Sequence, residues 1–314
     1  MPTRPEPLRQ RLAAQLAGAC DWPDEQRDGL VQAILQQHGE SVQAILIYGS
    51  YLRGKRDTLL DFYVLLDRYA AMPSRWQAVL AWLLPPNVYQ VHFGGPEGES
   101  RAKYALMTLG RFEYAMRRDF HSYFWARFVQ PSGLIFCRDE STRERVVAAL
   151  LDAAATFVRR VVPRLPPRFS SRDLISTGLA LTYRCELRSE PAGHAGTLYN
   201  HNAAYYQGLV SDLSGQGLPF ESADEKDRYT NLTGPARRKW SSASWWLRRV
   251  QGKALSVLRL LKAVMTFAGG FDYLLWKIGR HSNIHVEATE RQRRYPLIFG
   301  WPVLWQLYRR GAFR

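Results

Sequence analysis

Residues with the chemistry to hold a magnesium triphosphate lie close together near the start of the chain. The apolar stretch 44–48 ends at Gly49 and Ser50, and a second apolar stretch begins at Asp61. A glycine lets backbone amides approach phosphate oxygens, and a serine hydroxyl adds a further donor. An aspartate at the start of the next strand can hold a divalent cation against the same phosphates. The pattern predicts a strand, a phosphate-binding turn and a strand with a Mg²⁺ ligand, although Gly-Ser also marks ordinary hairpins.

This order of elements is typical of nucleotidyltransferases of the polymerase-beta type, in which a second carboxylate follows two residues after the first. Here that position is Tyr63. Asp67 shares the face of the expected strand, but it lies roughly 20 Å from Asp61, too far to share a metal. The expected strands 87–93 and 103–109 contain no acid. The sequence therefore predicts a site with one clear carboxylate ligand.

Apolar periodicity predicts an α+β fold with a small mixed sheet, then a mostly helical domain and a basic amphipathic helical tail. The similarity of the first strands and the Gly-Ser turn to polymerase-beta-type enzymes implies that the first domain is a polymerase-beta-like nucleotidyltransferase domain. Helices are expected at 5–19, 24–38, 74–84, 111–129 and 141–162, and strands at 42–48, 61–67, 87–93 and 103–109. A proline-rich break at 163–167 and a polar stretch at 221–239 set the expected boundaries. The domains are a nucleotidyltransferase domain (1–163), a winged-helix-like domain (164–230) and a membrane-associating tail (231–314).

Positive charge is concentrated in the tail. The chain has a net charge of +15, and 231–314 holds sixteen Lys or Arg against three Asp or Glu, with six of the ten tryptophans. A basic and tryptophan-rich segment favours an anionic membrane surface over nucleic acid. The residues expected to contact lipid are Arg259, Lys262, Trp276, Lys277, Trp301, Trp305, Arg309 and Arg310.

The apolar stretch 255–278 is long enough to span a bilayer. Its charges at Arg259 and Lys262 would each cost about 2.5 kcal/mol or more at the bilayer centre, which disfavours a span. Two alternatives remain from the sequence: a helix that lies in the membrane interface, or a helical hairpin that packs on the protein.

Three scattered cysteines without metal-ligand spacing indicate a reducing compartment, without disulfides or zinc. The N-terminal stretch lacks the apolar segment of a signal peptide. The expectation is a peripheral membrane protein on the cytoplasmic face of a bacterial inner membrane.

Four stretches, in order, are similar to one family, the mitochondrial-type CTP:phosphatidate cytidylyltransferases (the translocator assembly and maintenance family). Tyr48-Gly-Ser, with Asp61-Phe and Asp67, resembles that family's Tyr-Gly-Ser and Ile-Asp-Phe-Ile…Val-Val-Asp. Lys103-Tyr-Ala-Leu-Met-Thr resembles its Lys-Tyr-Gly-Val-Val-Ser. The family also lacks the second acid, which agrees with Tyr63.

The other two stretches extend the resemblance to about residue 190. Tyr123, Arg127 and Pro131 match its Leu-Tyr-x-Ala-Gly-Arg-Leu-x-Lys-Pro. The last match runs from Phe-Ser-x-x-Asp-Leu at 169–174 to Thr-Tyr…Glu-Leu-Arg at 182–188. The chain departs from the family at Ala126, at Glu186 and at 51–52.

The resemblance implies transfer of CMP from CTP to phosphatidic acid, with release of pyrophosphate and with Mg²⁺ as cofactor. The attacking phosphate monoester is already anionic, so the site needs charge neutralisation and in-line positioning instead of a general base. The implied roles are triphosphate binding by Gly49 and Ser50, Mg²⁺ binding by Asp61, phosphate neutralisation by Lys103 and Arg127, and closure over the nucleotide by Tyr183, Glu186 and Arg188.

Several alternatives stay open. Lys103 also fits a solvated strand end, and Arg127 and Arg188 also fit structural ion pairs. A catalytically inactive, membrane-bound adaptor would explain the missing second acid. A nucleotidyltransferase that acts on RNA would explain the charge, but not the tryptophans.

Overall fold

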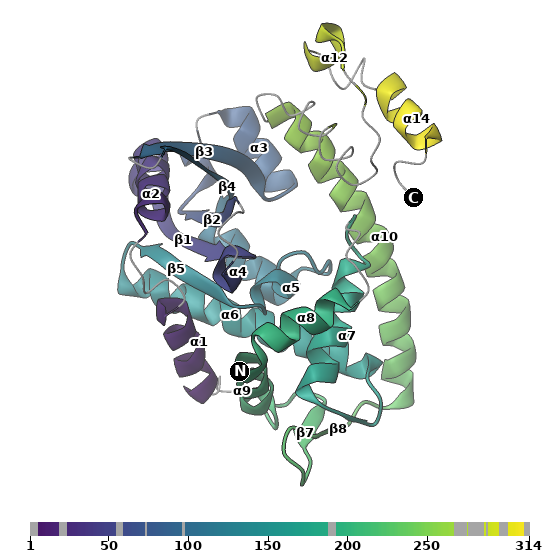
Figure 1. Cartoon of the computed structure of the whole chain (residues 1–314). Helices are drawn as coiled ribbons and strands as arrows, with labels where there is room; N and C mark the ends of the chain where they lie inside the picture. The colour runs from purple at the N-terminus through teal and green to yellow at the C-terminus, as the bar shows by residue number, and fades with distance from the viewer. Residues whose placement is uncertain are drawn as a thin grey trace.

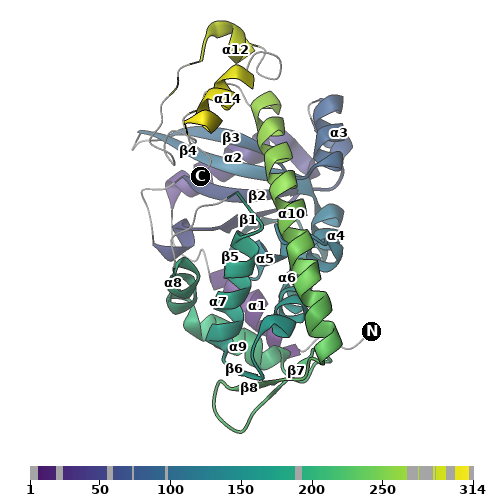
Figure 2. The same ribbon diagram turned by 90° about the vertical axis from the view of Figure 1, so that its right-hand side faces the viewer.

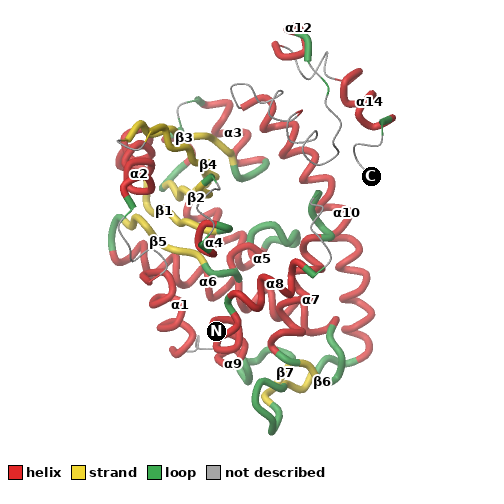
Figure 3. The backbone as a smooth tube through the Cα atoms, in the orientation of Figure 1, coloured by secondary structure: helices red, strands yellow, loops and turns green. Residues whose placement is uncertain are grey.

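The structure is a computed structural model that describes residues 6–18, 24–54, 59–72, 74–95, 98–187, 193–266, 275, 286, 288–294 and 301–310. The chain has a mixed α+β architecture built on a five-stranded mixed sheet (Figure 1), as the expected class requires. Figure 3 shows the sheet in one half of the molecule and mostly helices in the other.

The central sheet has the strand order β3-β4-β2-β1-β5. Its strands are β1 (Val42–Tyr48), β2 (Leu60–Leu66), β3 (Asn87–Gly95), β4 (Gly98–Thr108) and β5 (Ser132–Cys137). The β2–β4 pair is parallel, and the other neighbouring pairs are antiparallel. Strand β5 was not predicted, and it extends the sheet beyond β1.

Helices cover both faces of the sheet, as the alternation of buried side chains in β2 requires. Tyr63 and Leu65 face the core formed with α1 (Glu6–Gly18), α4 (Leu109–Arg118), α5 (Trp125–Phe128) and α6 (Glu140–Val161). Phe62 and Val64 face the opposite core, which α2 (Glu25–His38) and α3 (Arg75–Leu83) complete. The single helix expected over 111–129 is instead two helices, α4 and α5, separated by a loop.

The second half of the chain packs helices α7 (Ser171–Tyr183), α8 (His194–His201) and α9 (Ala203–Leu213) beside a small sheet. That sheet has the order β6 (Arg168–Phe169), β8 (Tyr229–Asn231), β7 (Phe220–Ser222). Ser170 and Asp173 form the expected capping box at the start of α7. One hydrophobic cluster includes residues from α1, β1 and α6 as well as from α7 and α9, so the core is continuous across the expected boundary at 163.

Helix α10 (Pro235–Thr266) runs along both halves of the molecule (Figure 2). It begins inside the stretch that was expected to be a polar linker. Its inward side chains donate hydrogen bonds to backbone carbonyls of the body: Trp245 to Arg160 (3.0 Å), Arg248 to Phe120 (2.9 Å), Arg259 to Pro85 (3.0 Å), and Lys262 to Leu84 and to Pro86 (2.7 Å).

These contacts correct the expectation that Arg259 and Lys262 face lipid. Lys262 is only 5% exposed, and both side chains hold α10 against the loop that contains Pro85. A buried cation needs such acceptors, because the loss of its hydration is otherwise uncompensated.

Beyond α10 the structure describes Leu275 and two short helices, α12 (Glu290–Arg294) and α14 (Trp301–Arg309). Trp276 and Lys277 lie outside the described residues. On α14, Trp305 is 63% exposed, and Arg309 and Arg310 are exposed. Within the described part of the chain, no helix has both the length and the apolar character needed to cross a bilayer.

Candidate nucleotide-binding site

Tyr48, Asp61 and Lys103 form a row across three neighbouring strands. Asp61 on β2 is the register partner of Tyr48 on β1 and of Lys103 on β4. Side chains of register partners lie on the same face of a sheet. The expected metal ligand and the expected phosphate-neutralising lysine are therefore neighbours on the face that carries Tyr63.

The turn after β1 brings its backbone against Asp61. Gly49 has φ +92°, a left-handed conformation that side chains rarely adopt, and a Cβ added there would lie 3.5 Å from Asp61 Oδ2. The chain continues into a short helical turn at Tyr51–Arg53, and Arg53 Nη1 donates to the Gly49 carbonyl at 3.0 Å. This turn places an arginine beside the glycine that the sequence singled out.

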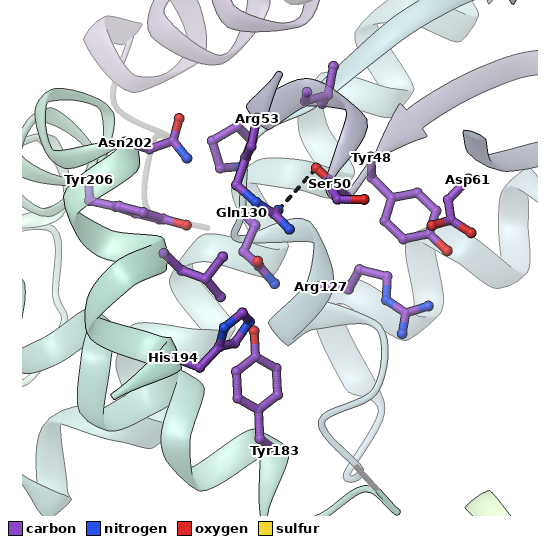
Figure 4. Close-up of a pocket in the computed structure, with 14 residues that line it drawn as sticks. Tyr48, Ser50, Arg53, Asp61, Arg127, Gln130, Tyr183, His194, Asn202 and Tyr206 are labelled. Atoms are coloured by element: carbon purple, nitrogen blue, oxygen red, sulfur yellow. Dashed lines mark hydrogen bonds between the residues drawn. The ribbon is translucent and has the colours of Figure 1, made fainter. Parts of the chain in front are cut away.

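A cavity of about 270 Å³ opens beside this turn (Figure 4). Five expected site residues line it: Gly49, Ser50, Asp61, Arg127 and Tyr183. The other lining residues are Tyr48, Leu52, Arg53, Gln130, Pro131, His194, Leu198, Asn202 and Tyr206. Stretches far apart in the sequence therefore contribute to one cavity.

The cavity has two chemically different sides. Figure 4 shows Arg127 on the side of Tyr48 and Asp61, and Tyr183, His194 and Tyr206 on the other. The Tyr183 and His194 rings lie 6.0 Å apart. One side thus offers a cation and a carboxylate, which suit phosphates and a metal, and the other offers aromatic rings, which suit a nucleobase.

Arg127 is held by tyrosines. Its Nη1 donates to the hydroxyls of Tyr63 and Tyr123, each at 3.2 Å, and its guanidinium lies 4.4 Å from the Tyr123 ring and 5.2 Å from the Tyr48 ring. Burial alone would lower the pKa of Arg127, but Tyr123, Tyr63, Tyr48 and, more weakly, Glu186 raise that pKa well above its ordinary value. The guanidinium therefore stays charged at the wall of the cavity.

The remaining expected residues are not part of the cavity wall. Lys103 neighbours Asp61 on β4 but does not line the cavity. Glu186 lines a much smaller cavity of about 10 Å³, together with Tyr123 and Arg259. Arg188 lies outside the described residues.

Sequence reasoning missed Arg53, Gln130, His194 and Asn202 as lining residues. Arg53 could have been predicted from the sequence, because it lies only three residues after Ser50 in the Gly-Ser turn. Asn202 joins α8 to α9 and occupies the N-cap position of α9, but its side chain makes no capping hydrogen bond. Its position in the cavity depends on the packing of α9, which the sequence does not specify.

The lining residues fit a magnesium ion that arrives with a triphosphate. Mg²⁺ commonly takes one or two carboxylates and completes its shell with phosphate oxygens and water. Asp61 supplies one carboxylate, and Ser50 adds a hydroxyl in the same wall. The described ranges contain no group of three His, Cys, Asp or Glu side chains arranged to hold a metal, so these ranges offer no cage made by the protein alone.

No protein-family model matches the chain, and the search of curated proteins also found no match. The similarity to the phosphatidate cytidylyltransferases therefore depends on the short motifs quoted above.

Proposed function

We propose that this protein is a nucleotidyltransferase of the polymerase-beta type that transfers CMP from CTP to phosphatidic acid at a membrane surface. The observation that carries the proposal is the position of Asp61 against the left-handed Gly49 turn, with Arg127 in the same cavity wall. That combination offers a metal ligand, close backbone approach and a fixed cation to one polyphosphate. The choice of CTP and phosphatidate comes from the motif resemblance.

The chemistry requires charge neutralisation and alignment. A phosphate oxygen of phosphatidate attacks the α-phosphorus of CTP, the bond to the β-phosphate oxygen breaks, and pyrophosphate leaves with the electron pair. Arg127 would hold phosphate oxygens, Arg53 and Lys103 would add positive charge nearby, and the aromatic side of the cavity would hold the base. Asp61 and Ser50 would hold Mg²⁺, which when bound neutralises phosphate charge.

The outward face of α10 supports the membrane part of the proposal. The helix contains eight Lys or Arg and no Asp or Glu, and three of these cations, Arg248, Arg259 and Lys262, face inward. Large apolar side chains on it are 45–74% exposed: Trp240, Trp246, Leu247, Val250, Val257 and Leu258. An exposed apolar stripe beside cations suits an anionic bilayer surface. The proposed lipid contact is thus the side of α10 opposite to Arg259 and Lys262.

Thermal denaturation with each nucleoside triphosphate tests the nucleotide site. A ligand that binds the folded state raises the melting temperature by mass action, so CTP with Mg²⁺ should raise it more than ATP, GTP or UTP. Equal increases in melting temperature with all four nucleotides would contradict the preference for CTP. No increase with any nucleotide would contradict nucleotide binding in this cavity.

A second candidate is a nucleotide-binding protein without transfer activity, and the presence of one carboxylate, Asp61, among the described lining residues favours it. Such a protein would show the CTP shift but would form no lipid-soluble nucleotide product.

A further inference from the structure

The Tyr123 ring contacts two arginines that come from distant parts of the chain. The Arg127 guanidinium lies 4.4 Å from the ring centroid, and the Arg259 guanidinium of α10 lies 4.1 Å from it. Tyr123 also accepts a hydrogen bond from Arg127 at 3.2 Å. Arg127 lines the large cavity, whereas Arg259 and Tyr123 line the small one. Tyr123 therefore links an arginine of the proposed nucleotide site to an arginine of α10.

We propose that Arg259 is a positioning residue that fixes the nucleotide-side Arg127 through the Tyr123 ring. Arg259 is itself anchored, because its Nε donates to the Pro85 carbonyl at 3.0 Å. A cation over an aromatic face restricts the ring, and the restricted ring presents its hydroxyl to Arg127. The preorganised guanidinium then meets the phosphates without a conformational cost.

The electrostatics agree with this arrangement. Burial raises the pKa of the Tyr123 phenol, but Arg127 and then Arg259 lower it, Glu186 raises it, and the net direction is downward. Both Arg127 and Arg259 thus contribute positive potential at the Tyr123 hydroxyl oxygen. Loss of Arg259 would change the electrostatic potential at this oxygen, which accepts the hydrogen bond from Arg127.

The inference goes beyond the proposed function, because it makes the membrane-facing helix part of the nucleotide site. Helix α10 would contact lipid with its outer face and fix Arg127 from its inner face. It would thus couple the proposed lipid surface to the proposed nucleotide site. The test therefore has two parts. The first measures nucleotide binding and rests on the proposed function, and the second measures the position of Arg127 without nucleotide.

Lys262 supplies a matched control. It lies one turn after Arg259 and donates to the carbonyls on either side of Pro85, at Leu84 and Pro86, so it fastens α10 to the same loop. The cation–π contacts described for Tyr123 are those with Arg127 and Arg259. A purely structural role for Arg259 predicts equal effects of Arg259→Gln and Lys262→Gln.

The first part of the test measures the Kd for Mg²⁺–CTP by calorimetry in the full chain. Arg259→Gln should weaken binding roughly tenfold, the scale of one lost cation–π contact in a desolvated site, and Lys262→Gln should stay within about twofold. Arg259→Lys, which keeps the charge but loses the planar stack, should fall between. Equal losses in the two Gln variants would overturn the proposal. If Arg259→Gln does not fold, Arg259→Lys is compared with Lys262→Gln in the same way.

The second part of the test uses crystal structures without nucleotide. Arg259→Gln, or Arg259→Lys if the first variant does not fold, should move Arg127 Nη1 beyond hydrogen-bond distance of the Tyr63 or Tyr123 hydroxyl, and Lys262→Gln should not. An unmoved Arg127 in the Arg259 variant overturns the positioning role. If wild type binds no nucleotide while Arg127 still moves, the positioning role holds and the proposed function fails.

Discussion

Tyr63 Oη accepts a hydrogen bond from Arg127 Nη1 at 3.2 Å. Tyr63 occupies the position at which the polymerase-beta pattern carries its second metal-binding carboxylate. A carboxylate there would form an ion pair with Arg127 and would compete with phosphate for the guanidinium. A neutral hydroxyl orients Arg127 and leaves its positive charge in place. If the proposed function holds, Tyr63 fixes a cation, Arg127, at the place of a second metal ligand, which would suit a nucleophile that is already ionised.

The Gly49 turn gives the first prediction. Gly49→Ala should strain the backbone by about 1–3 kcal/mol, because the φ of +92° disfavours a side chain. Relief of that strain would move the backbone amides that are proposed to contact the triphosphate. We expect at least a tenfold weaker binding of Mg²⁺–CTP, measured by calorimetry.

Gly54→Ala is the matched control. Gly54 also has a positive φ, +80°, but nothing lies within 4 Å of its Cβ position, and it does not line the cavity. Its substitution should lower stability by a similar amount and leave CTP binding unchanged. An equal loss of CTP binding in both variants would show that the substitutions weaken binding through a general loss of stability and not through the Gly49 turn.

The close approach of α10 to the body gives the second prediction. A Cβ on Gly252 would lie 2.4 Å from the Cys185 carbonyl oxygen, which is backbone and cannot rotate away. Gly252→Ala should lower the free energy of unfolding by about 1–3 kcal/mol in chemical denaturation. Gly110→Ala, in a helix with open space around its Cβ position, should be neutral or slightly stabilising. If Gly252→Ala is also neutral, α10 does not pack as described.

Local sequence signals predicted the part of the site nearest to Gly49. The β1 and β2 strands, the capping of α2 by Asp24 and the capping box of α7 depend on alternation and short-range hydrogen bonds, which a single sequence displays. Strand β5 was missed because its stretch after Pro131 is short and has a glycine at its second position.

The inward role of Arg259 and Lys262 was missed for a different reason. Helical spacing placed both on one polar stripe, but it could not show whether the stripe met lipid headgroups or backbone carbonyls. The carbonyls at 84–86 belong to a loop about 175 residues earlier in the chain. Tertiary packing, and not local pattern, decided that face of α10.

Lys262 gives a third prediction, for stability against pH. Burial, and then the neighbouring Arg259, lower the pKa of Lys262 from 10.5 to about 7. Between these values the unfolded chain binds a proton that the folded chain has released, so stability rises with pH across this window. Wild type should gain about 1–2 kcal/mol relative to Lys262→Met between pH 6.5 and 8.5, measured by urea denaturation.

This pH window lies below the pKa values of two other buried cations, Arg160 and Arg248. Burial lowers the pKa of Arg160 to about 9 and that of Arg248 to about 10. A constant difference in stability between wild type and Lys262→Met across the window would contradict the lowered pKa of Lys262 in the folded protein.

The outer face of α10 gives a fourth prediction. The double substitution Trp240→Ser and Trp246→Ser should reduce sedimentation with phosphatidate-rich vesicles, because it removes two exposed aromatic anchors. High salt should weaken only the electrostatic part of the free energy of vesicle binding, which is about 1 kcal/mol for each cation near the membrane surface. Tyr114→Ser, at another exposed aromatic position on α4, should leave sedimentation unchanged. Equal sedimentation of the double variant and wild type would place the lipid contact elsewhere.

The most direct test of the proposed function is transfer itself. The pure protein is incubated with CTP labelled in its α-phosphate, Mg²⁺ and phosphatidate vesicles, and label that extracts into organic solvent is counted. We expect lipid-soluble label from wild type, and a loss of at least a hundredfold in Asp61→Asn, which keeps the size of the side chain but loses the anionic metal ligand. Absence of lipid-soluble label from a folded wild type that binds CTP, or full activity in Asp61→Asn, would contradict the proposed function.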